Sequence, residues 1–132
     1  MDAFNISIKN CFVGSPIPFK VNFWSTPPDY NSDPQVPGVA NDISNWTFLF
    51  TWKLYLTDPD ASALYQLDWT IAAGAGTGGT TSWKIPATGT LNVPAKTLTF
   101  WDLKTITPPS TEPVPALAGT IYLNPSVTLR QS

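Results

Sequence analysis

The sequence lacks histidine altogether and contains a single cysteine, Cys11. Without histidine, the Ser-His-Asp and Cys-His forms of nucleophilic catalysis are excluded, and so are histidine-ligated metal sites. One cysteine forms no disulfide within the chain and no cysteine metal cluster. We therefore expect a protein that is not an enzyme, with no catalytic residues, no metal and no cofactor.

Charge is also scarce, because charged residues make up 12% of the chain against about 25% in a typical soluble domain. There is one glutamate, Glu112, and one arginine, Arg130, and the net charge is −2. Nucleic acid binding needs a basic face, so we expect no nucleic acid partner. A weakly charged surface does little to keep copies apart, which favours a homo-oligomer or a place in a symmetric assembly.

Long apolar runs are missing too, and none approaches the ~18 residues of a membrane span. The first residues, Met1–Asn5, have neither the basic nor the apolar region of a signal peptide. We expect no membrane partner, synthesis in a cytoplasm, and any later export by assembly into a particle.

What the chain does contain is proline and strand-forming residues. Its 14 prolines are scattered, which forbids long helices, and the segments between them are rich in β-branched and aromatic residues. We predict an all-β fold: a single antiparallel β-sandwich domain over residues 1–132, with about 7–9 strands, immunoglobulin-like or jelly-roll-like. The predicted strands are Asn5–Val13, Phe19–Trp24, Asn45–Leu56, Leu64–Ala72, Thr81–Ile85, Leu91–Val93, Thr97–Thr105, Gly119–Leu123 and Ser126–Leu129, with one helical turn near Asp60–Leu64.

Alternation within these strands predicts which side chains form the core. The predicted core residues share strand parity with one another. They are Trp46, Phe48, Phe50, Trp52, Leu54, Leu67, Trp69 and Ile71, packed against Phe19, Val21 and Phe23. Cys11 is predicted to be a small buried apolar residue.

Three loops interrupt the strands. Ser25–Asp42 carries four prolines and is longer than a simple connection requires. Ala72–Thr81 is glycine-rich and is predicted to be a flexible hairpin tip without a phosphate-binding motif. Thr107–Pro115 is predicted to be the polar connection of a late hairpin.

Asp58 and Asp60 flank Pro59 in a connection between strands. We interpret them as a turn, because aspartate side chains bond to nearby backbone and proline presets φ. Calcium binding, or an acid–base pair of a hydrolase, is the alternative.

Tryptophan is the residue type that bears most on function, with six in the chain. Trp24, Trp83 and Trp101 are not assigned to the core by parity, and whichever is left uncovered is a candidate for contact with a partner. The Pro-rich loop supplies the other predicted partner-interface residues, which are Pro28, Tyr30, Pro34, Pro37 and Val39. The alternative function of an uncovered tryptophan is to stack on the ring of a sugar.

Three segments carry a family resemblance: Gly14–Phe23 (GSPIPFKVNF), Asp42–Leu54 (DISNWTFLFTWKL) and Leu98–Arg130. The last combines an aromatic–aromatic–Asp strand (Phe100–Asp102), a Pro-rich hairpin and a Gly-led strand that closes on Thr-Leu-Arg. In this order the segments resemble the N-terminal β-sandwich domain of phage baseplate upper proteins and related tail-fibre adaptors.

The resemblance implies a virion structural protein that acts as a tail, baseplate or fibre adaptor, with other virion proteins as partners. The chain departs from the pattern in its long insertion at Ser25–Asp42 and in stopping where adaptors continue. The alternatives are therefore a capsid decoration protein and a carbohydrate- or receptor-binding module with a host-surface glycan as ligand.

Overall fold

The computed structural model describes residues 4–26, 29, 31, 33–35, 37–55, 57–59, 62–91 and 93–125. The regular elements of this part of the chain are strands apart from one short helix, so the predicted all-β class is confirmed. The elements are β1 (Phe4–Phe12), β2 (Ile17–Asn22), β3 (Trp24–Thr26), β4 (Val39–Ala40), β5 (Thr47–Lys53), β6 (Tyr65–Thr70), β7 (Thr80–Ile85), α1 (Ala87–Thr90), β8 (Thr97–Ile106) and β9 (Val114–Asn124). In these described ranges, no helix is both long and apolar enough to cross a bilayer.

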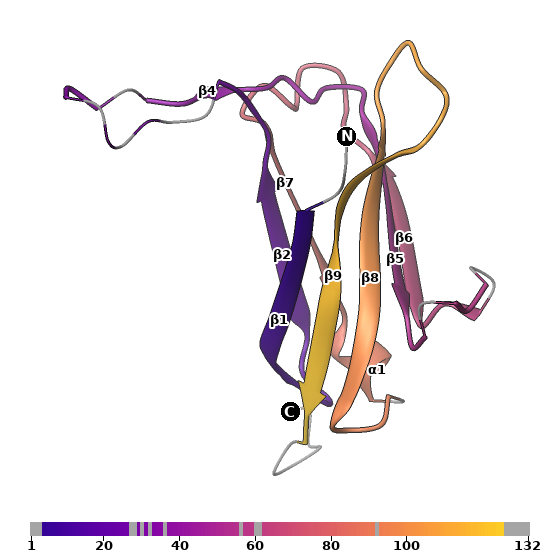
Figure 1. Ribbon diagram of the computed structural model, residues 1–132. Helices are drawn as coiled ribbons and strands as arrows, with labels where there is room; N and C mark the ends of the chain where they lie inside the picture. The colour runs from indigo at the N-terminus through magenta and orange to yellow at the C-terminus, as the bar shows by residue number, and fades with distance from the viewer. Residues whose placement is uncertain are drawn as a thin grey trace.

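The strands form one large sheet and two small ones (Figure 1). The large sheet has the order β1-β9-β8-β5-β6, while β2 pairs with β7 and β3 pairs with β4. The prediction of a purely antiparallel arrangement is wrong at one edge, because β1 runs parallel to β9. The two strands lie at opposite ends of the sequence, so no tight turn constrains their relative direction.

The centre of the core lies on β5, whose side chains alternate as the sequence predicts. Phe48, Phe50 and Trp52 are 0% exposed, and Thr47, Leu49, Thr51 and Lys53 on the other face are half-buried. Trp46 lies just before the strand and packs against the core while remaining partly exposed. The alternation is possible because a pleated strand sends successive side chains to opposite faces.

Aromatic rings join the large sheet to the β2–β7 pair. Phe19 of β2 lies 5.1 Å from Phe50 of β5 and 5.3 Å from Trp101 of β8, measured between ring centroids. Trp83 of β7 lies 5.5 Å from Phe50 and 5.1 Å from Trp69 of β6. Such tilted and edge-on pairs add about 0.5–1.5 kcal/mol each beyond the area that they bury. The two sheets therefore share a single aromatic core.

A buried hydrogen-bond chain crosses three strands of the large sheet. The Trp52 indole Nε1 donates to Thr99 Oγ1 (2.7 Å), and the Thr99 hydroxyl donates to the carbonyl oxygen of Ile121 (2.8 Å). All three residues are 0% exposed. Because a buried indole N–H without an acceptor is costly, Thr99 lets a tryptophan occupy the centre of the core.

Several predicted elements differ in detail. Leu91–Val93 is no strand: Leu91 keeps helical backbone angles at the end of α1, and Val93 N donates to the carbonyl oxygen of Thr90. The short helix α1 follows Pro86 and was not predicted. Its buried Thr90 accepts a hydrogen bond from the backbone N–H of Gly14 at 2.9 Å, which ties the helix to the β1–β2 turn.

Two further predictions fall partly or wholly on residues outside the described ranges. Ser126–Leu129 lies outside them, as does Asp60 at the start of the predicted helical turn, although Ser62 within that turn has 3₁₀ geometry.

The prediction for Cys11 is confirmed, since it is a free, buried thiol whose pKa is raised by burial.

Candidate functional site

Most of the described residues of the Pro-rich loop Ser25–Asp42 lie in an arm that extends from one end of the molecule (Figure 1). We define the arm as the described residues 24–26, 29, 31, 33–35 and 37–40. Of the predicted interface residues on it, Trp24, Pro34, Pro37 and Val39 are exposed, whereas Pro28 and Tyr30 lie outside the described residues. Trp24 is 44% exposed and Val39 is 54% exposed, so both present apolar surface to solvent.

The other two tryptophans proposed for partner contact lie in the core instead. Trp83 is 8% exposed and Trp101 is 5% exposed. Strand parity explains this. Trp83 lies on the same face of β7 as Ile85, and Trp101 lies on the same face of β8 as Leu103. Ile85 and Leu103 are both fully buried. Their indole N–H groups have no hydrogen-bond partner among the described residues. Trp24 is the tryptophan of the three that remains available for contact.

The base of the arm is fixed by one backbone hydrogen bond to the glycine-rich loop and by one between the two segments that flank the arm. Phe23 N donates to the carbonyl oxygen of Gly79 (2.7 Å), and Asn41 N donates to that of Phe23 (2.9 Å). The Phe23 ring packs on Trp46 at 5.5 Å and on Phe48 at 5.7 Å. The arm is thus anchored to the core by the residue that immediately precedes it.

Two glycines make this anchoring possible, and they are buried rather than part of a free hairpin tip. A Cβ at Gly79 would lie 2.6 Å from the carbonyl oxygen of Phe23, and the residue has φ +70°. A Cβ at Gly76 would lie 2.3 Å from the backbone nitrogen of Ser44. Backbone segments approach here more closely than any side chain permits. The loop Ala72–Thr81 is therefore a structural support for the arm.

Beyond its base, the described residues of the arm include no buried side chain. Strands β3 and β4 pair through Trp24 with Ala40 and Thr26 with Val39, with an irregularity between the two pairs. The Ser25 hydroxyl adds a bond to the carbonyl oxygen of Val39 (3.2 Å). A two-stranded ribbon with so little buried surface is only marginally stable in isolation. The arm thus holds apolar side chains, Trp24 and Val39, that the described chain leaves about half exposed.

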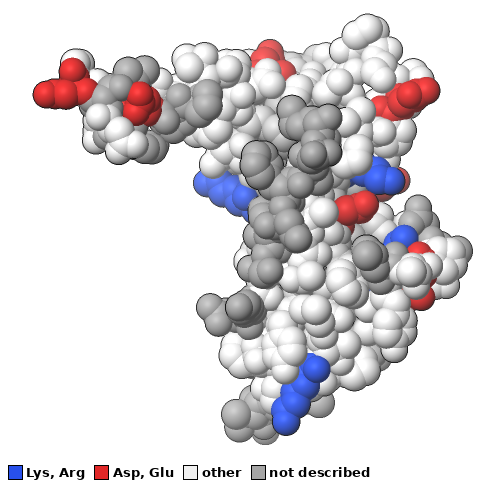
Figure 2. All heavy atoms as spheres, viewed as in Figure 1, with Lys and Arg blue, Asp and Glu red and all other residues white. Residues whose placement is uncertain are grey.

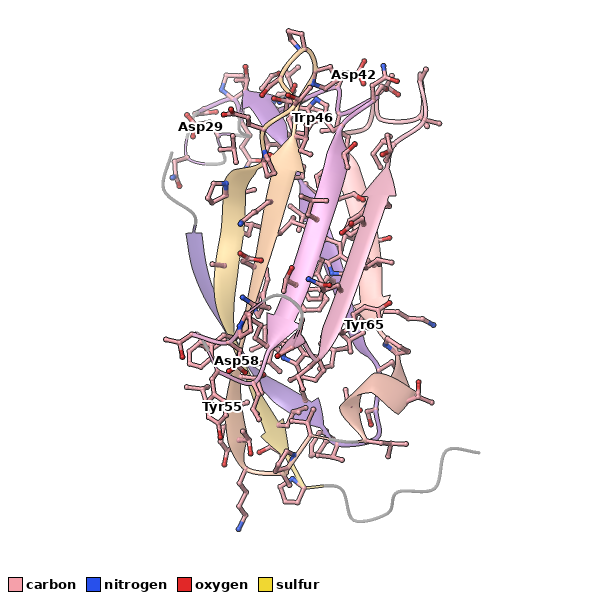
Figure 3. The ribbon with its side chains drawn as sticks, turned by 90° about the vertical axis from the view of Figure 1, so that its right-hand side faces the viewer. Asp29, Asp42, Trp46, Tyr55, Asp58 and Tyr65 are labelled. Atoms are coloured by element: carbon pink, nitrogen blue, oxygen red, sulfur yellow. The ribbon has the colours of Figure 1, made fainter. Side chains whose placement is uncertain are left out.

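Acidic residues gather at this end of the molecule. Asp29 and Asp33 lie on the arm, Asp42 at its base, and Glu112 in the loop between β8 and β9. Figure 2 shows acidic atoms at the tip of the arm, and Figure 3 places Asp29 and Asp42 at the same end as Trp46. The pKa of Asp42 is lowered by hydrogen bonds from Ser44, whose backbone N lies 3.0 Å from Asp42 Oδ1.

Two lysines lie on a different surface, the outer face of the β2–β7 pair, which sequence analysis did not single out. Lys20 faces Ser82, and Lys84 faces Pro18. The exposed residues of the two strands are Pro18, Lys20, Asn22, Thr80, Ser82 and Lys84, so this face carries two positive charges and no negative ones. Alternation within Phe19–Trp24 and Thr81–Ile85 places Lys20 and Lys84 opposite the apolar side chains, and this is the sequence signal that predicts the face.

The turn interpretation of Asp58 agrees with its contacts. Asp58 N donates to the carbonyl oxygen of Tyr55 (3.1 Å), and Tyr55 N donates to Asp58 Oδ2 (3.3 Å). Lys53 Nζ donates to the carbonyl oxygen of Asp58 (2.8 Å). Figure 3 shows Tyr55 and Asp58 toward the end opposite Asp42. Asp60 is outside the described residues, and within the described ones no three His, Cys, Asp or Glu side chains are grouped as metal ligands require.

The arrangement thus offers an exposed apolar and acidic arm and a basic sheet face. Comparison of the chain with protein-family models, with curated proteins and with solved structures found no match.

Proposed function

We propose that this chain is a non-catalytic structural protein that works through protein–protein contacts made by the arm. The observation that carries the proposal is the exposure of Trp24 and Val39 on a ribbon that leaves the core. An apolar side chain that is about half exposed gains further free energy when a partner covers it. Prolines in the arm reduce the conformational entropy that ordering against a partner costs.

The architecture suited to this role is an immunoglobulin-like β-sandwich. In support, β9-β8-β5-β6 have the neighbour order of the G, F, C and C′ strands, and β2 pairs with β7 as B pairs with E. A jelly roll would distribute eight strands over two sheets, which the pairing of five strands and two does not favour. The arm would then be an insertion between the B and C strands.

The virion is the proposed location, as an adaptor of tail, baseplate or fibre, and this part rests on the sequence resemblance alone. Capsid decoration is the alternative within the same class. Both uses place the chain in a symmetric assembly, where a small, weakly charged domain is held by its neighbours.

Deletion of residues 28–37 tests the proposal. We expect the thermal melt of the variant to stay close to that of the parent, because the described residues of this segment are exposed. We expect the variant to be lost from particles purified on a density gradient and examined by mass spectrometry. A matched control shortens the loop at residues 107–113, at the same end of the molecule, and should leave incorporation unchanged. A deletion variant that enters particles normally overturns the proposal.

Sugar binding is tested separately on a glycan array. Because Trp83 is buried, its substitution would disturb the core rather than a sugar platform. The informative variant is Trp24→Ala, and reproducible sugar binding that this substitution abolishes would replace the proposal with a carbohydrate-binding module.

A further inference from the structure

We propose that the arm docks onto the outer face of β2 and β7 in a second copy of this chain. The inference rests on the proposed function, because it names the partner of the same arm. The two surfaces belong to one molecule, yet they are complementary in charge. One is a projecting ribbon and the other is a sheet face.

Charge is the first argument. Asp29 and Asp33 lie on the arm, and the described residues of the arm include no lysine or arginine. The receiving face carries Lys20 and Lys84 with no carboxylate on it. The register places these lysines as diagonal neighbours, about 7–8 Å apart between their Cα atoms. Two carboxylates close together in sequence can thus meet two ammonium groups that lie close together on a sheet.

Side-chain chemistry is the second argument. Trp24 and Val39 supply apolar contact on the arm. The receiving face supplies short side chains, Ser82 and Thr80, against which an aromatic ring can pack. Interfaces of this kind place aromatic anchors at the centre and charged pairs at the rim, where complementary charges favour association and like charges oppose it.

The direction of the arm is the third argument. Figure 1 shows the arm leaving the body on the side of β2 and pointing away from β5 and β6. Two copies with opposed β2–β7 faces, related by a twofold axis, would each extend an arm over the partner. Such an isologous arrangement uses both arms and closes as a dimer, whereas one-way docking would leave one arm uncovered.

Sedimentation velocity of the full chain tests the inference. We expect a dimer in about 0.1 M salt whose dissociation constant rises by at least about tenfold in about 1 M salt, because the Debye length falls from about 10 Å to about 3 Å. The double variant Lys20→Glu, Lys84→Glu should be monomeric in low salt. Its matched control is Lys96→Glu, Lys104→Glu, which changes the net charge equally away from the face and should still dimerise.

A charge exchange makes the test specific. The variant Lys20→Asp, Lys84→Asp and the variant Asp29→Lys, Asp33→Lys should each be monomeric alone, since arm and face then carry the same sign. Mixed together they should form a heterodimer in which both arms meet an opposite charge. Thermal melts of all variants verify that each is folded.

A parent chain that stays monomeric in low salt overturns the inference, as does a Lys20→Glu, Lys84→Glu variant that dimerises like the parent. If either occurs while deletion of residues 28–37 still abolishes incorporation into particles, the partner of the arm is a different protein and the proposed function stands. If the charge exchange succeeds but the deletion variant enters particles, the dimer stands and the proposed function fails.

Discussion

Strand β5 and the arm are both rich in apolar side chains, but their surroundings differ completely. On β5, Phe48, Phe50 and Trp52 are 0% exposed, while on the arm Trp24 and Val39 are about half exposed. Strand β5 pairs with β6 on one side and β8 on the other, and rings of the β2–β7 pair pack on its inner face. Strand β3 pairs only with β4 within the described residues. The burial of an apolar residue is thus set by the number of neighbouring strands and layers.

The comparison predicts that substitutions on β5 should destabilise the protein far more than those on the arm. The largest effect is expected for Phe50→Ala, which removes a ring in contact with Phe19, Trp83 and Trp101. The free energy of unfolding should fall by about 3–5 kcal/mol, measured by urea denaturation. Trp24→Ala is the matched control, with an expected change within about 0.5 kcal/mol. Equal losses for the two variants would contradict the comparison.

The next effect concerns the buried hydrogen-bond chain. Thr99→Val keeps the volume but leaves the Trp52 indole N–H without its acceptor, which should cost about 1–3 kcal/mol. Thr51→Val, on the opposite face of β5, is the control and should change the free energy of unfolding little. Chemical denaturation of both variants gives the difference, and a neutral Thr99→Val would mean that the bond adds no stability.

A smaller loss of stability is expected at Gly79, which lies against the base of the arm where the arm joins the core. Gly79→Ala places a Cβ against the carbonyl oxygens of Phe23 and Asn41 at a residue with φ +70°, which should cost at least about 1–2 kcal/mol. Gly78→Ala, where a Cβ meets open space, is the control. Thermal melts compare the two. Hydrogen exchange at the Phe23 amide should be faster in Gly79→Ala, and unchanged exchange would show that the anchor does not depend on this glycine.

The smallest effect is electrostatic and lies at the base of the arm. Because hydrogen bonds from Ser44 lower the pKa of Asp42, its carboxylate contributes stability above its ordinary pKa of about 3.9, and this contribution is lost as the pH falls through the lowered folded-state pKa. Carbon-13 NMR titration should show a midpoint for Asp42 below the ordinary value. Ser44→Ala should return the midpoint toward that value, and no change would assign the shift to another cause.

Much of the core could be predicted from alternation alone. Trp46, Phe48, Phe50 and Trp52 were assigned to one face of a strand, and the structure places them in or against the core. The same rule applied to Thr81–Ile85 and Thr97–Thr105 would have buried Trp83 and Trp101. Their assignment as candidates for partner contact is therefore wrong, because both are buried.

The sequence by itself determined the all-β class, the strand faces and the exclusion of histidine-based chemistry, because residue types and a period of two are local properties. Tertiary structure decided that β1 lies parallel to β9 and that the glycine-rich loop supports the arm. It also decided that Lys20 and Lys84 share a face. These features depend on which distant segments meet, and pairing between segments far apart in sequence is governed by the packing of the whole core rather than by local preference.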